Sequence, residues 1–123
     1  MEKLKEKQKN VIMKKILFLL LITFLSFQLK AQKIYSVNYE SRADIKLFVV
    51  EYESRADLLV FNEKYESRAK GNEGLWFFVE HESQADKSIY FVDYESQSDL
   101  KIFFVKYESR AGWKNLSKKH LLY

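Results

Sequence analysis

The strongest constraint on this chain is a hexapeptide that occurs six times. The first copy spans residues 39–44, and the others begin at Tyr52, Tyr65, His81, Tyr94 and Tyr107. The copies start 13 residues apart, except for a central interval of 16 residues that contains Gly71 and Gly74. The first three copies map onto the last three by a constant shift of 42 residues, so the array is a duplicated unit of three repeats. Residues needed six times over are usually needed for a scaffold.

Each repeat predicts a short strand followed by a sharp corner. The strand segments are 35–39, 48–52, 61–65, 77–81, 90–94 and 103–107, and they alternate with period two. One face takes aromatic residues and valine, as in Phe48, Val50 and Tyr52, and is expected to be the core. The other face begins apolar, as at Leu47, and ends polar, as at Glu51, so its first part is expected to be buried too. The predicted fold is a small all-β array of six or seven strands.

The corners carry a recurring Glu and, two residues later, Arg or Gln. Side chains two apart lie on one side of an extended chain, so neighbouring corners are expected to form a ladder of carboxylates and guanidinium groups. Under the shift of 42, Arg42 and Arg55 correspond to Gln84 and Gln97, which would limit crowding of like charges. The ladder residues are Glu40, Arg42, Glu53, Arg55, Glu66, Arg68, Glu82, Gln84, Glu95, Gln97, Glu108 and Arg110. The corner Asp is expected to cap a freed backbone amide.

Residues 1–31 have the pattern of an export signal. A Lys-rich start precedes the apolar run 16–29, whose 14 residues fall short of the ~20 that span a bilayer. The expected cut follows Ala31, which would leave no transmembrane anchor. Met13 offers an alternative start, and a buried helix of a cytosolic protein is the alternative to a signal.

The remaining chain divides into a repeat domain, residues 32–113, and a short basic tail, residues 114–123, expected to be solvated. Residues 32–123 carry 14 basic and 15 acidic side chains, so the basic balance of the full chain gives no reason to expect a nucleic-acid partner. There is no cysteine, which excludes disulfides and thiolate chemistry. We expect a monomer.

Catalytic, metal and cofactor sites are not expected. His81 stands where the other five copies have Tyr, and no partner for a catalytic base is suggested. The repeated Ser lacks a nucleophile elbow and is interpreted as a turn former. Asp44, Asp57, Asp86 and Asp99 lack the spacing of repeat calcium sites, and the segment 71–74 is too short and acidic for a phosphate loop.

The repeats resemble a known family. Tyr-Glu-Ser-Arg-Ala-Asp units, an Arg version followed by a Gln version, the segment 71–79 and the ending 109–113 are similar to the 7(1) septoil knot domain over about residues 33–113. The resemblance implies a small all-β domain whose chain winds into a seven-crossing torus knot, with no established activity and no catalytic residues. Glu63 departs from the pattern, since the other copies have valine there.

Two function classes follow. The first is a non-enzymatic, kinetically stable domain that is structural or binds a protein, exported to the periplasm or the outside of a bacterium. The alternative is a glycan-binding domain, or a weak carboxylate-dependent hydrolase, that uses Trp76, Trp113, exposed tyrosines and a pair of Glu residues. A ligand face requires aromatic side chains in water beside free carboxylates, whereas a scaffold has the Glu and Arg groups paired.

If residues 1–31 are an export signal, the protein isolated from its native cell should begin near Gln32. Mass spectrometry of that protein should detect no peptide from residues 1–25. A full-length species in the cytosol would contradict export.

Overall fold

The computed structural model describes residues 2–27 and 32–123, which belong to two separate units. The first unit contains a single helix, α1 (Glu2–Phe27). The all-β prediction is therefore wrong for the whole chain, although α1 lies in the segment expected to be an export signal. The expected cut after Ala31 lies outside the described residues. Among the residues that are described, no helix is both long and apolar enough to cross a membrane.

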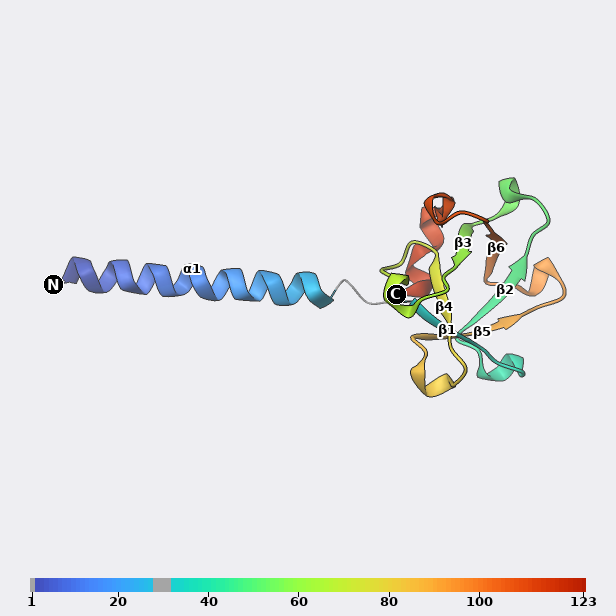
Figure 1. Cartoon of the computed structure of the whole chain (residues 1–123), viewed down its shortest axis with the longest axis horizontal. Coiled ribbons are helices and arrows are strands. Elements are labelled where there is room, and N and C mark those ends of the chain that lie inside the picture. Colours follow the sequence, from blue (N-terminus) through green and yellow to red (C-terminus); the bar gives the residue numbers. More distant parts are fainter. Residues whose placement is uncertain (1, 28–31) are drawn as a thin grey trace. The chain divides into compact units, whose positions relative to one another are not determined.

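The second unit is a closed barrel of six parallel strands (Figure 1). The strands are β1 (Gln32–Ser36), β2 (Ile45–Val49), β3 (Leu58–Asn62), β4 (Leu75–Phe78), β5 (Lys87–Phe91) and β6 (Leu100–Phe104). Their order is β4-β1-β5-β2-β6-β3, and pairing of β3 with β4 closes the barrel. A short strand, β7 (Gly112–Trp113), pairs antiparallel with β3. The predicted small β array is confirmed at this level.

The two halves of the array are interleaved around the barrel. β1, β2 and β3 alternate with β4, β5 and β6, so each of the six parallel pairings joins a strand of the first half to a strand of the second. The first three strands therefore occupy alternate positions around the barrel, and the last three strands fill the positions between them.

The barrel interior is formed by the strand face that begins apolar and ends polar, not by the face predicted as the main core. Ile34, Leu47, Val60, Ile89 and Ile102 are fully buried, together with Trp76 and Leu100. The face predicted as the main core lies outside the barrel: its valines are mostly buried, its Phe residues and the strand tyrosines Tyr35 and Tyr90 are half-buried, and the tyrosines that precede the corners are exposed. Both faces are apolar near the middle of each strand, so periodicity does not distinguish inside from outside. The strands also end three residues earlier than predicted.

Each corner is one 3₁₀ turn that folds back over the outside of the barrel. The turns are η1 (Glu40–Arg42), η2 (Glu53–Arg55), η3 (Glu66–Arg68), η4 (Glu82–Gln84), η5 (Glu95–Gln97) and η6 (Glu108–Arg110). Figure 1 shows them at the periphery of the strands. In η1 the amides of Arg42 and Ala43 donate to the carbonyls of Tyr39 and Glu40 at 3.1 Å, so the turn needs neither Pro nor Gly. Ala56, next to η2, packs with Val50 and Leu59 in an apolar cluster outside the barrel.

The corner aspartates fix the register of the interleaved strands. Asp44 donates its backbone amide to the carbonyl of Ser88 at 2.9 Å, while its carboxylate accepts the amide of Ser88 at 2.9 Å. The same two-way clamp joins Asp57 to Lys101, Asp86 to Lys33 and Asp99 to Lys46. Each clamp joins the residue just before one strand to a neighbouring strand of the other half.

The junction between β3 and β4 requires glycine. Gly74 has φ of +82°, and a Cβ atom there would lie 2.3 Å from the carbonyl oxygen of Leu59. Its own carbonyl accepts the amide of Phe61 at 2.9 Å, so this close approach is part of the pairing that closes the barrel.

The last ten residues are not a solvated tail, contrary to expectation. The 3₁₀ helix η7 (Leu116–Leu122) places Leu122, which is 3% exposed, in the core cluster. The Gln32 side chain donates to the Leu122 carbonyl and accepts from the Trp76 indole, both at 3.0 Å. Lys114 and Asn115 donate their amides to the Asp57 carbonyl. Because these partners lie at the beginnings of strands, the segment caps the amino-terminal end of the barrel.

Candidate functional site: the corner ring, its groove and the open end of the barrel

The ladder residues lie in a ring around the barrel. Arg42 pairs with Glu82, and Arg55 with Glu95, at 2.7 Å in both cases. Arg110 pairs with Glu53, and Arg68 lies 3.9 Å from Glu108. These pairs connect η1 to η4, η3 to η6, η6 to η2 and η2 to η5, which is the order of the corresponding strands. Each Arg thus reaches the Glu of the neighbouring corner rather than the residue that corresponds to it under the shift of 42.

Lysines approach the two ladder glutamates that are not paired with Arg. Lys33 lies 3.2 Å from Glu66, and Lys46 lies 3.5 Å from Glu40. These are the corners that Gln84 and Gln97 would reach if they were Arg. The ladder side chains are about a third to two thirds exposed, so each pair alone contributes only ~0–1 kcal/mol. The ring therefore mainly sets the surface charge pattern.

A polar groove lies between η3 and η4, where the ring lacks an Arg. Its volume is about 740 Å³, and Lys33, Glu66, His81, Gln84 and Asp86 line it. The outer-face residues Phe77 and Val79 also line it. Among sequence candidates, His81 is thus an exposed groove residue, and nothing in the groove identifies it as a base.

Glu63 is a functional candidate that the sequence marked only as a departure from the repeat. It is 4% exposed, and its Oε1 atom has no hydrogen-bond partner. Burial is the largest cause that raises the pKa of Glu63 above 4.5, followed by a hydrogen bond with Glu108 and the charge of Glu108, while Arg68 lowers it. The protonated form of Glu63 is therefore favoured.

The carboxyl-terminal end of the barrel carries exposed apolar side chains. Val49, Phe91 and Phe104 are 42%, 37% and 37% exposed, and each ends its strand. β5, β2 and β6 are neighbours, so the three side chains lie at the same end of adjacent strands, and we call them the apolar rim. Phe78 ends β4 but packs against the core, edge-on to Trp76.

Five exposed tyrosines accompany this end of the barrel. They are Tyr39, Tyr52, Tyr65, Tyr94 and Tyr107, and each is 66–68% exposed. Each lies three residues after the last residue of its strand, so all five follow the carboxyl-terminal strand ends, where the apolar rim also lies.

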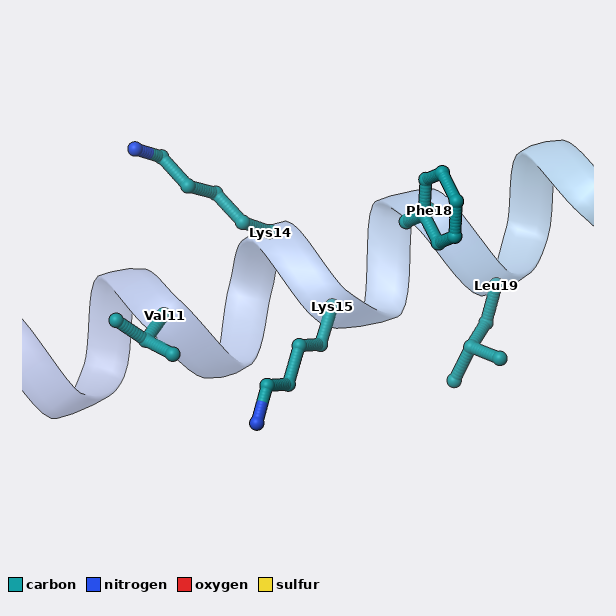
Figure 2. Close-up of a pocket in the computed structure, with 5 residues that line it drawn as sticks. All are labelled: Val11, Lys14, Lys15, Phe18 and Leu19. Carbon is teal, nitrogen blue, oxygen red and sulfur yellow. The ribbon is translucent and has the colours of Figure 1, made fainter.

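The other aromatic and ionisable candidates do not form a site. Trp76 is fully buried, and the Trp113 indole donates to the Asn72 carbonyl at 2.8 Å. Asp44, Asp57, Asp86 and Asp99 hold the strand clamps, and the described residues contain no group of three metal-ligating side chains. The side chains in Figure 2, Val11, Lys14, Lys15, Phe18 and Leu19, follow the i, i+3, i+4, i+7, i+8 spacing of one helix face, so this hollow is the surface of α1 alone.

Comparison with known proteins supports the resemblance seen in the repeats. The family model of the 7(1) septoil knot domain matches residues 31–114, which include all six corners and end before η7. No curated protein matches the chain, and no solved structure does.

Replacing Glu63 by Val, the residue of the equivalent positions, should stabilise the protein by roughly 1–3 kcal/mol at neutral pH, because a buried carboxyl without a full set of partners is removed. The raised pKa of Glu63 means that the folded state holds a proton that the unfolded state has released. The native protein should therefore lose stability relative to Glu63→Val as the pH rises above 4.5.

Urea denaturation of both proteins at several pH values tests this prediction. Glu63→Gln is the matched control, since it keeps a polar side chain but does not titrate, so it should show the same trend with pH as Glu63→Val. If the difference in unfolding free energy between the native protein and Glu63→Val stayed constant from pH 4.5 to neutral pH, the raised pKa of Glu63 would be contradicted.

Proposed function

This chain belongs to the 7(1) septoil knot domain family, and on that premise we propose that it is a non-enzymatic, exported scaffold that binds a protein through the open end of its barrel. The observation that carries the proposal is the apolar rim, Val49, Phe91 and Phe104, on three neighbouring strands. Exposed apolar side chains that gather at one end of a domain are typical of protein interaction sites.

The surroundings of the rim support a protein partner. Tyrosine is enriched in protein interfaces because its ring combines apolar area with a hydroxyl group and only a few rotamers. Tyr52, Tyr94 and Tyr107 follow the three strands that carry the rim, and all are about two thirds exposed. The ladder carboxylates are paired with Arg or Lys, which suits a scaffold better than a hydrolase.

Export is part of the same proposal. The Lys-rich start and the 14-residue apolar run of residues 16–29 support removal of a signal and a location in the periplasm or outside a bacterium. The lack of cysteine is compatible with that location only if other contacts hold the domain together, and the strand clamps and the cap over the barrel supply such contacts.

Glycan binding is the second candidate function. The exposed tyrosines favour it, since sugar rings stack on aromatic faces, and the polar groove offers hydrogen-bonding groups. Burial of Trp76 removes one of the aromatic residues on which this alternative was based.

Replacing Phe91 and Phe104 by Ser should weaken partner binding, raising Kd by at least about tenfold, because central apolar contacts dominate interface energies. Leu116→Ser is the matched control, because Leu116 is 71% exposed and lies in the cap at the other end. Affinity capture with the full chain, followed by titration of the captured protein against each variant, checks the prediction. A ligand that proves to be a polysaccharide, or a partner bound equally by all variants, would reject it.

We further infer that the domain is knotted and that the knot makes it kinetically durable. The alternation of the two halves around one closed barrel, with every strand placed between strands of the other half, supports a threaded path. A threaded chain must cross high barriers in both directions, and six similar strands offer many wrong pairings during folding.

A threaded barrel should unfold over minutes or longer in strong denaturant and refold with a slow phase. Proline isomerisation cannot cause such a phase, because the chain has no proline. Stopped-flow and manual-mixing fluorescence would follow both reactions through Trp76 and Trp113. A single refolding phase within milliseconds, with equally fast unfolding, would reject the knot and the durable scaffold.

A further inference from the structure

We propose that the groove between η3 and η4 binds the guanidinium group of an arginine side chain from the partner protein. The inference rests on the proposed protein-binding function and names the chemistry of one contact. The internal repeats carry it, because the equivalent spaces in four of the six corner-to-corner contacts hold an Arg of the chain itself.

The groove residues correspond by repeat position to residues of the first repeat, which contains Arg42. Tyr35, Val37 and Tyr39 correspond to Phe77, Val79 and His81 under the shift of 42 residues. Arg42 corresponds to Gln84. The clamp between Asp44 and Ser88 corresponds to the clamp between Asp86 and Lys33. In the first set, Arg42 extends to Glu82, the glutamate of the neighbouring corner, at 2.7 Å. In the second set, the glutamate of the neighbouring corner is Glu66, which lines the groove with Gln84.

Gln84 cannot replace the missing Arg. A glutamine side chain is shorter and uncharged, so it supplies neither the reach nor the positive charge of a guanidinium group. Lys33 approaches Glu66 at 3.2 Å, but an ammonium group is a point charge and does not offer the paired donors that a carboxylate accepts in a bidentate geometry. The Glu66 side chain remains 59% exposed and therefore accessible to an incoming group.

The charge and shape of the groove also favour a cationic side chain. Three carboxylates line the groove, those of Glu66, Glu80 and Asp86, against one lysine, Lys33, so acidic groups outnumber basic ones there. Phe77 and Val79 provide apolar surface for the methylene groups of an arginine. A volume of about 740 Å³ accommodates one long side chain together with part of its backbone.

The test uses the full chain, labelled with ¹⁵N and titrated with N-acetyl-arginine amide, with N-acetyl-lysine amide as the comparison. Saturable shifts are expected at the amides of Lys33, His81 and Gln84, with binding of the arginine probe several-fold tighter than that of the lysine probe. Glu66→Gln should weaken binding by about tenfold. Lys33→Met should strengthen it, because it removes the competing cation.

The decisive variant is Gln84→Arg, which introduces the Arg that four of the six corners have at this position and should fill the groove and block the probe. Gln97→Arg is the matched control: it makes the same change in η5 and should leave binding unchanged. Equal shifts with both probes, shifts confined to other residues, or undiminished binding by Gln84→Arg would overturn the proposal. A partner that depends on Phe91 and Phe104 but binds Gln84→Arg normally would reject the groove and leave the proposed function intact. An arginine probe bound in the groove, with no partner sensitive to the apolar rim, would reject that function alone.

Discussion

The clamp made by the corner aspartates is the interaction on which the rest of the structure depends. A backbone amide and a carboxylate on one residue bind the carbonyl and the amide of one residue in the other half of the array, as in Asp57 and Lys101. Two hydrogen bonds to the same residue fix both the position and the direction of the strand that follows. Once the registers are set in this way, the corner turns are spaced so that each Arg can reach the neighbouring Glu. The charge ring is thus a consequence of the clamps.

The repeat period made much of this fold predictable. The number of strands, the position of the corners and the role of Asp as a cap for a free amide all follow from a motif repeated at fixed spacing. The repeat period does not predict which strand face lines the barrel interior. Leu47 and Phe48 lie on opposite faces and are both apolar, so alternation does not distinguish the inner face from the outer one. Period-two alternation also predicts the five corner tyrosines in the core, yet they follow the strand ends and are exposed to solvent. The lysines of the last ten residues favour a solvated tail, but Leu121 and Leu122 are apolar and pack in or against the core, so these two residues could have predicted the cap.

Several departures from the repeat lie in one sector of the barrel. Glu63 replaces a valine just after β3, Gly74 allows β3 and β4 to meet, and His81 and Gln84 change the corner that follows β4. The third and sixth corners also lack the clamping Asp, because Lys70 and Gly112 occupy those positions. A repeat that must close on itself needs one irregular junction, and here that junction holds both the groove and the buried carboxyl. The candidate site residues could be recognised individually from the sequence, but their gathering in one sector required the strand order.

The alternation of the two halves has a consequence for the time at which the protein can fold. β1, β2 and β3 pair only with β4, β5 and β6, so the first half of the domain contains no pair of strands that could form a sheet on its own. A growing chain on the ribosome therefore has no sheet partner for β1, β2 or β3 until β4, the first strand of the second half, has been synthesised. The barrel therefore cannot be assembled strand by strand in the order of synthesis, because no two consecutive strands within either half are neighbours.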